Sequence, residues 1–250
     1  MHSKTLITAI ALALPVFALA PRLAARDVVK QPKYHFDTAP EPRWKEPLVY
    51  PYELLRDGVK GAATVTLVID DAGKILSATV DKATRPEFGA ATLAMLQRWD
   101  FEPAWKDHRP ATGRFTFEQE FSRYDKDLVN EGLQNLLVLV QKHPEKIVSS
   151  AKLDAPLKPT GARAPIFPLT LHGQTTKGEA TVEILIDGDG VVRLPRIVSA
   201  SDPAFGAAAA QAVFGWQFQP PMKAGQPVIT RVRIPFEFVD KPNEPAEKAK

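Results

Sequence analysis

The sequence contains no cysteine, and this absence excludes several kinds of structure at once. Disulfide bonds, thiolate metal sites and a lipid anchor on an N-terminal cysteine are all impossible. The fold must therefore be held together by its hydrophobic core and its backbone hydrogen bonds. With 250 residues, of which 44% are hydrophobic and 24% charged, the chain has the composition of a globular protein of one or two domains.

The sequence also carries little net charge. Its 32 basic and 29 acidic residues give a formal charge of +3. Removal of residues 1–25, which include Lys4 and Arg22, would leave 30 basic against 29 acidic residues. Binding to nucleic acid requires a concentrated basic surface, and the sequence has no basic run. We therefore predict no nucleic-acid partner.

Catalytic and metal-binding patterns are missing as well. No two of the five histidines lie four residues apart or beside a ligand acid in a motif. Gly-x-Ser-x-Gly, Ser-x-x-Lys and a glycine-rich phosphate loop are also absent. Asp187-Gly188-Asp189-Gly190 is similar to the start of a calcium loop, but the later ligands are missing and we interpret it as a turn. We predict a protein that is not an enzyme and has no metal or cofactor.

The longest apolar stretch, residues 5–20, is short for a membrane span. Its sixteen residues would reach about 24 Å as a helix, whereas the hydrocarbon core of a bilayer is about 30 Å thick. Lys4 precedes the stretch, and Ala18-Leu19-Ala20 has the form of a cleavage site, with Val16-Phe17-Ala18 and Leu23-Ala24-Ala25 as alternatives. We predict a signal peptide in residues 1–25, with a short uncleaved anchor as the alternative. Residues 26–49 are expected to form an extended lead-in and residues 239–250 a disordered tail.

What the sequence does contain is a long internal repeat. Residues 50–121 and 167–238 align without a gap at a constant offset of 117, and roughly a third of the paired positions are identical. A period of this length indicates two tandem domains rather than a solenoid. Because each repeat has its own predicted strands and helix, we expect residues 45–124 to fold without the rest of the chain.

The pattern within each repeat predicts a strand, a strand, a helix and a strand. Residues 63–69 and 181–186 alternate between apolar and polar side chains, and an Asp-x-x-Gly turn leads to second strands at about 74–81 and 191–198. A helix starts near Pro86 or Pro203, with Thr84, Ser201 and Asp202 as candidate caps. The third strands are expected at 114–121 and 231–238.

This order of elements predicts an α+β fold. If each three-stranded sheet is antiparallel, the third strand lies beside the first, and the spatial order is 2-1-3. The second and third strands are then edges, where Pro195 and Pro235 are tolerated. Trp99 and Trp216 lie at helical spacing from Phe88 and Phe205, which we expect to be buried. This spacing favours packing of the tryptophans in the core over a binding platform.

The connector between the repeats, residues 122–166, also contains a helical pattern. Its apolar face consists of Leu128, Val129, Leu133, Leu136, Leu137 and Val140. The pattern ends near His143-Pro144, and prolines then indicate an extended run. We expect the helix to pack on a repeat; a partner-binding helix is the alternative.

The combined motifs resemble the C-terminal domain of TonB. These motifs are Tyr-Pro followed by Gly-x-x-Gly at 50–61, Asp-x-x-Gly at 70–73, Pro-x-Phe before the helix and Trp-x-Phe-x-Pro after it. The resemblance implies a periplasmic domain that binds the short "TonB box" peptide of an outer-membrane receptor by strand addition. It implies an ExbB-ExbD-type motor as a second partner only if the N-terminus is an uncleaved anchor that holds the protein in the inner membrane.

Strand addition requires a free edge with unpaired backbone groups. The predicted partner-binding residues lie on the third strands and in the Tyr-Pro and Phe-Pro segments: Tyr50, Pro51, Arg114, Thr116, Glu118, Glu120, Phe167, Pro168, Arg231 and Arg233. Pro235 removes one donor from the second repeat, so we predict binding at the first. The function predicted is peptide binding in TonB-dependent transport. The alternative is a structural or adaptor protein of the cell envelope.

Overall fold

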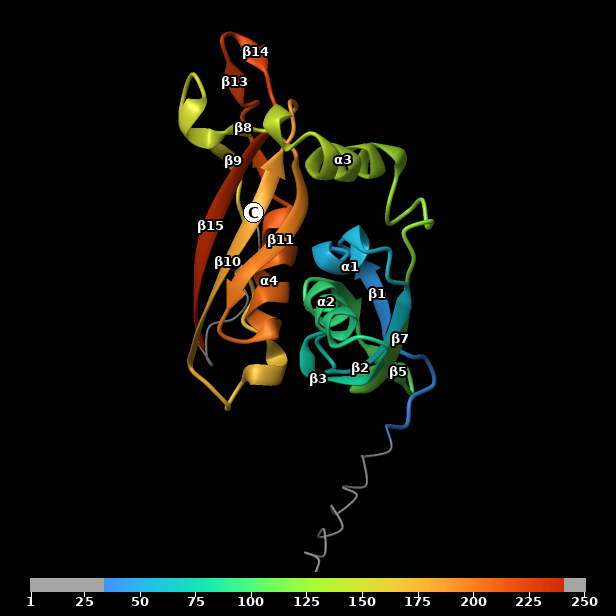
Figure 1. Ribbon diagram of the computed structural model, residues 1–250. Helices are drawn as coiled ribbons and strands as arrows, with labels where there is room; N and C mark the ends of the chain where they lie inside the picture. Colours follow the sequence, from blue (N-terminus) through green and yellow to red (C-terminus); the bar gives the residue numbers. More distant parts are fainter. Residues whose placement is uncertain (1–33, 241–250) are drawn as a thin grey trace, which may run out of the picture. The chain divides into compact units, whose positions relative to one another are not determined.

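The computed structural model describes residues 34–240 (Figure 1). The predicted signal peptide and most of the predicted tail lie outside these residues. Within the described part of the chain, no helix has the length and apolar character needed to cross a membrane.

The first repeat is a three-stranded antiparallel sheet with a helix on one face. Its strands are β2 (Gly61–Ile69), β3 (Ile75–Ala83) and β7 (Gly113–Phe121), and its helix is α2 (Pro86–Leu96). The spatial order β3-β2-β7 is the predicted order 2-1-3. Alternate residues of β2 are fully buried against α2, as expected for a half-buried strand.

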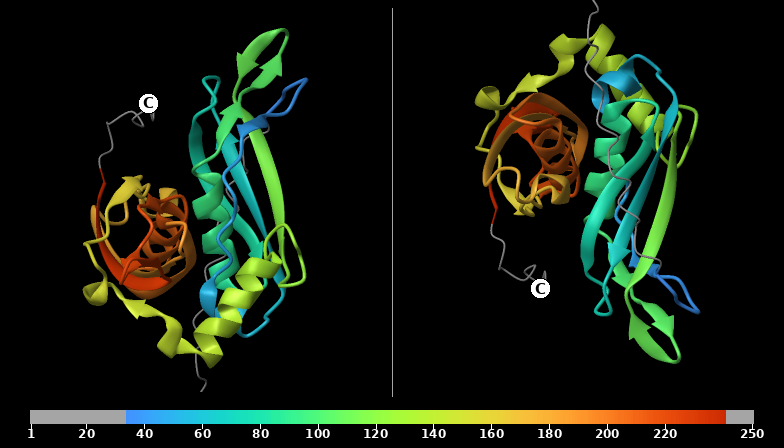
Figure 2. Two further views of the ribbon diagram at one scale, coloured as in Figure 1. Left: turned by 90° about the horizontal axis from the view of Figure 1, so that it is seen from above. Right: turned by 90° about the horizontal axis from the view of Figure 1, so that it is seen from below.

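The second repeat has the same strands and one more. Strands β10 (Lys177–Ile186), β11 (Val192–Ala200) and β15 (Thr230–Val239) surround α4 (Pro203–Phe214), which lies against the concave side of the sheet in Figure 2. The order is β11-β10-β15-β8, in which the connector strand β8 (Val148–Ser149) pairs parallel to β15. The prediction of three strands was therefore incomplete here, because the connector passes along the start of β15 and pairs with it.

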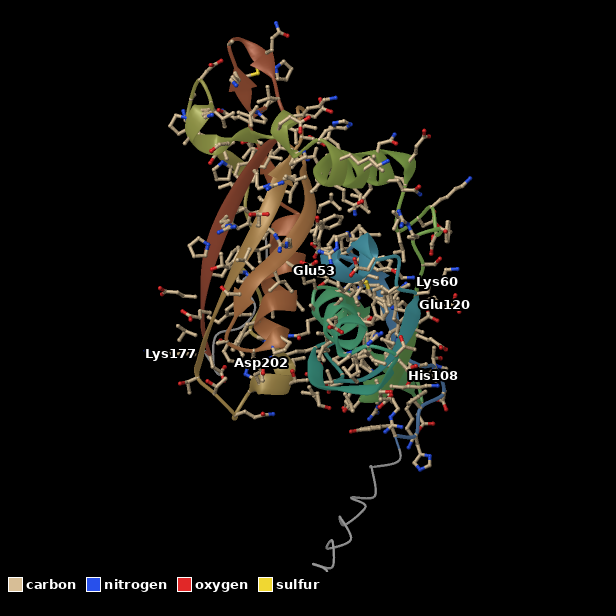
Figure 3. All side chains as sticks on the ribbon, viewed as in Figure 1. Glu53, Lys60, His108, Glu120, Lys177 and Asp202 are labelled. Carbon is tan, nitrogen blue, oxygen red and sulfur yellow. The ribbon has the colours of Figure 1, made fainter. Side chains whose placement is uncertain are left out.

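The helix termini correct one prediction about capping. Asp202 caps α4 by accepting from the backbone N–H of Ala204, and Figure 3 shows it at the start of that helix. Thr84 does not cap α2; its hydroxyl instead accepts from the backbone N–H of Ala62 at 3.1 Å. Ser201 makes the equivalent bond to Glu179. Both hydroxyls therefore fasten the end of a second strand to the first strand.

Close packing of helix on sheet depends on a glycine in each repeat. A Cβ at Gly89 would lie 2.8 Å from Val80, and a Cβ at Gly206 would lie 2.9 Å from Ile197. Both separations are shorter than side chains tolerate, so the glycines let each helix approach the second strand of its own sheet.

The folded repeats begin before residues 50 and 167, where the internal alignment of the sequence begins. Short strand β1 (Glu41–Trp44) pairs with β4 (Asp100–Glu102), and β9 (Pro159–Gly161) pairs with β12 (Gln217–Phe218) in the same way. Further upstream, Asp37 and Asp154 bind the tips of two equivalent hairpins, β5 (Ala104–Lys106) with β6 (Arg109–Ala111) and β13 (Met222–Lys223) with β14 (Gln226–Pro227). Most of the predicted lead-in, and the end of the connector, thus belong to the folded repeats.

The connector helix α3 (Glu131–Lys142) covers part of the first repeat. Asn130 caps it through the N–H of Leu133, and it ends at His143 as predicted. Leu136 and Leu137 are buried in the hydrophobic cluster of the first repeat. The packing prediction for this helix is confirmed. Short 3-10 turns, η1 (Pro144–Lys146) and η2 (Ser150–Lys152), flank β8.

The two repeats contact each other through equivalent elements. Helix α1 (Tyr52–Arg56) contacts β11, its counterpart η3 (Leu169–Leu171) contacts β3, and α2 packs on α4. Leu185 and Leu194 of the second repeat belong to the hydrophobic cluster of the first. Independent folding of residues 45–124 stays a prediction, but in the whole chain the core of this segment is completed by α3 and by the second repeat.

Candidate functional site

The outer side of β7 is a sheet edge. Strand β7 pairs with β2 over nine consecutive residues without a register shift. Among residues 34–240 no other strand pairs with β7, so its outward backbone groups have no strand partner there. An edge of this kind offers a row of N–H and C=O groups to an added strand.

Pro235 shows which residues of the third strands point their backbone outward. It lies in β15 opposite Thr181, and the β10–β15 ladder passes it without a register shift. Proline has no N–H to donate to β10. Its position is therefore one at which the backbone N–H and C=O sides point away from β10. The equivalent position in β7 is Glu118, opposite Thr64. The backbone N–H and C=O groups of successive residues point to alternate sides of a strand. Those of residues 114, 116, 118 and 120 therefore all point away from β2.

The side chains of these residues lie on the sheet face opposite α2. Thr116, Glu118 and Glu120 are exposed, and Figure 3 shows Glu120 at the outer side of β7. The Thr66 hydroxyl donates to Asp81 at 2.5 Å and lies 2.9 Å from the Thr116 hydroxyl. The structure therefore brings the four predicted residues of β7 together on one strand.

On the inner face, the same edge is bordered by aromatic rings. Phe115 and Phe117 are half-buried, and their rings lie 5.2 Å from Phe101 and 5.1 Å from Trp99 respectively. The edge thus combines polar groups on one face with partly exposed aromatic surface on the other. Such a surface accommodates an extended peptide whose side chains alternate in the same way.

The corresponding edge of β15 is interrupted twice. Strand β8 occupies it at Thr230 and Arg231, with the N–H of Val148 bonded to the carbonyl of Ile229 at 2.9 Å. Further along, Pro235 lacks a donor. Arg231 and Arg233, predicted to bind a partner, instead surround the buried carboxylate of Glu183, with Arg233 Nε at 3.0 Å. A hollow of about 280 Å³ beside β8 is lined in part by these three side chains.

Tyr50, a predicted partner-binding residue, lies in the core. Its side chain packs edge-on against Phe88 and Phe121, and its hydroxyl donates to the carbonyl of Val59 at 2.6 Å. Burial raises its pKa above the ordinary tyrosine value. The ring closes the end of the hydrophobic core, so the hydroxyl is not available to a partner and the prediction is corrected.

The other residues of these segments also have structural roles. Phe167 takes the place of Tyr50 and packs against Phe205. Pro51 and Pro168 precede α1 and η3, where the fixed backbone of proline suits the start of a helical turn. Both are half-buried or buried, in keeping with a structural role.

Sequence reasoning missed β8 and the Glu183 cluster. Two residues are too short to give a strand pattern, so nothing in residues 148–149 indicates pairing. Glu183 replaces Thr66 at the aligned position, and arginines stand at 231 and 233, but only the sheet register shows that they converge. Within residues 34–240, no group of His, Asp and Glu side chains is arranged to hold a metal ion.

Comparison with known proteins agrees with the repeat pattern. The sequence profile of the family described as Gram-negative bacterial TonB protein C-terminal matches residues 46–122 and 163–239. Among solved structures, the solution NMR structure of Pseudomonas aeruginosa TonB CTD is 21% identical and covers 39% of this chain and 98% of that chain, with a TM-score of 0.32. A comparison with curated proteins finds no match.

Proposed function

This chain belongs to the TonB C-terminal domain family, and we propose that it is a periplasmic protein that binds an extended peptide at the outer edge of β7. The partner proposed is the TonB-box-like segment of an outer-membrane receptor, and the process is TonB-dependent transport across the outer membrane. The protein acts by binding and not by catalysis.

The observation that carries the proposal is the outer edge of β7, with which no strand among residues 34–240 pairs. Nine residues of this strand form a continuous ladder on one side and have no strand partner among residues 34–240 on the other. Backbone hydrogen bonds supply the affinity in strand addition, while alternate side chains supply the specificity. The edge of β15 offers fewer backbone N–H and C=O groups to a peptide, because β8 and Pro235 interrupt it.

Strand β8 supports the choice of edge. It is an observed case in which an extended segment adds to the third strand of this fold. The aligned edge of the first repeat has the same register with β2, and no other strand among residues 34–240 pairs with it. The first repeat is therefore the better site for a partner of several residues.

The alternative is a structural or adaptor role in the cell envelope. It is favoured by the reciprocal contacts of the two repeats, which use the fold for assembly. Cell fractionation separates the possibilities. A shortened, soluble periplasmic form would exclude direct coupling to an ExbB-ExbD-type motor, whereas a full-length inner-membrane form would support it.

The β7 site is tested by moving a proline between the repeats. Glu118→Pro removes one outward N–H at a position where the sister repeat tolerates proline, so we expect a folded protein. It should bind a synthetic TonB-box heptapeptide several-fold more weakly by calorimetric titration, since one hydrogen bond contributes about 0.5–1.5 kcal/mol. The matched control, Pro235→Glu, should not weaken binding. Unchanged affinity in folded Glu118→Pro would place the site elsewhere.

A further inference from the structure

We propose that the β7 edge selects peptides with basic side chains at alternate positions, and that Glu118 and Glu120 determine this selectivity. This inference rests on the strand addition proposed above and names the class of peptide. Both carboxylates are exposed, and both belong to residues whose backbone faces the added strand. They occupy the same face of the sheet because they are two positions apart.

The sheet itself offers these carboxylates no direct partner. Across β2, Glu118 lies opposite Thr64 and Glu120 lies opposite Ala62, both uncharged. Neither glutamate forms an ion pair within residues 34–240. In a sheet the strongest side-chain interactions are between directly opposed residues on neighbouring strands. For an edge strand, one of its two neighbours is the strand that is added.

The nearest cations of the first sheet are committed or distant. Lys60 directly precedes β2 and is the diagonal neighbour of Glu120, but its ammonium is 5.0 Å from the centre of the Tyr124 ring and forms no ion pair within residues 34–240. Lys82 is opposite Thr64 on β3, so it is two strands, or about 10 Å, from Glu118. At such a distance an exposed charge is strongly screened. A cation on the added strand would stand much closer, at about 5 Å between Cβ atoms.

The sister repeat lacks this pair of carboxylates, since it keeps only Glu237, the residue aligned with Glu120. On the same face of its sheet, the carboxylate of Glu183 is surrounded by Arg196, Arg231 and Arg233, with nitrogen–oxygen distances of 3.7, 3.8 and 3.0 Å. The position aligned with Glu118 is Pro235, which is uncharged. The carboxylate of Glu183 is thus neutralised within the second sheet, whereas those of Glu118 and Glu120 have no ion-pair partner within residues 34–240.

A second observation, from the sister repeat, supports a strand as the ligand of this edge. The edge of β15 aligned with β7 already holds β8, which pairs with Thr230 and Arg231. A segment placed on β7 in the same way and continued along the strand would run past Glu118 and Glu120. Its side chains on that face would oppose both carboxylates, and lysine or arginine there would form two cross-strand ion pairs.

The test compares two blocked heptapeptides, TVKVKVT and TVEVEVT, by calorimetric titration at low salt. Their valines can face the aromatic side of the edge while the charged pair faces the glutamates. We expect the full chain to bind the lysine peptide about three- to tenfold more tightly, with the preference weakened in 0.5 M salt. E118Q/E120Q should abolish the preference, and E118K/E120K should reverse it.

E237Q is the matched control, because Glu237 is an exposed residue of β15 aligned with Glu120. It should leave the preference unchanged. Equal binding of both peptides, or a preference that persists in E118Q/E120Q, would overturn the inference and leave strand addition intact. Failure of both peptides to bind the wild-type chain would overturn the inference, and the proposed function would fall with it if a TonB-box heptapeptide also failed to bind.

Discussion

Single residues show how far two copies of one sequence have diverged. Trp99 and Trp216 occupy aligned positions, and each indole N–H donates to an aligned carbonyl, that of Glu46 at 3.0 Å and that of Arg163 at 2.9 Å. Trp99 is only 7% exposed, whereas Trp216 is half-buried. Both tryptophans thus form the equivalent hydrogen bond, but Trp99 removes more apolar surface from water than Trp216 does.

The first prediction follows from this difference. Trp99→Ala should lower the free energy of unfolding by about 3–5 kcal/mol, because it leaves a large cavity beside Phe117. Trp216→Ala should cost clearly less, since part of that ring is already in water. Urea denaturation of both variants measures the difference. Equal losses, or a Trp99→Ala protein as stable as wild type, would contradict the core assignment.

At the scale of elements, each hairpin tip is held by one aspartate from the segment that precedes its repeat. Asp154 accepts from the backbone N–H groups of Ala224 and Gly225 at 2.8 and 2.9 Å, and Asp37 accepts from Asp107 at the aligned tip. Residues 107, 108, 224 and 225 all have positive φ, as expected in a tight hairpin turn. These bonds tie the upstream segment to the hairpin.

The second prediction concerns pH. The N–H groups of Gly225 and Ala224 hold the pKa of Asp154 below its ordinary value. Because the pKa is lower in the folded than in the unfolded chain, the stabilisation is complete above about pH 4 and is lost as pH falls through the folded pKa. Denaturation curves between about pH 2 and 5 should therefore show a smaller loss of stability on acidification in Asp154→Asn than in wild type.

The control for this prediction is Asp71→Asn, which changes an exposed turn aspartate of the first repeat. It should retain the acid sensitivity that Asp154 contributes. If Asp154→Asn and wild type lose stability in parallel on acidification, the two backbone bonds do not persist in solution.

At the scale of the molecule, each repeat forms hydrogen bonds to the other through a glutamine side chain. Gln211 of α4 donates to Pro47 O at 2.8 Å and accepts from Val49 N at 3.3 Å. Gln97, the C-cap of α2, donates to Phe167 O at 3.1 Å and accepts from Leu169 N at 3.3 Å. Each amide thus satisfies a carbonyl and an N–H two residues apart. The glutamines are not aligned in the repeats, so this reciprocity is a product of tertiary structure.

The third prediction is that Gln211→Ala weakens the contact between the repeats more than Gln97→Ala. Gln211 is 1% exposed, and its loss leaves a buried N–H without a partner at a cost of about 1–3 kcal/mol. Amide exchange at Val49 should become faster in Gln211→Ala and stay unchanged in Gln97→Ala. Unchanged protection of Val49 in both variants would mean that the bond contributes nothing.

The sequence by itself determined the local architecture. Alternation in residues 63–69 and 181–186, the Asp-x-x-Gly turns and the prolines at the helix starts predicted both sheets and both helices, because these features depend on periodicity and on backbone sterics. The position of Pro235 also indicated which third strand is the better edge. Of the predicted site residues, those of β7 lie together on one exposed strand, and peptide binding there stays a prediction.

Tertiary structure alone decided the rest. The burial of Tyr50, the two-residue strand β8, the arginines around Glu183 and the glutamine contacts all join residues distant in sequence. Such pairings leave no periodic signal, since each depends on where two separately formed elements meet. The sequence specified two similar units, and only their packing established that they share a core and that one edge is partly filled by the chain itself.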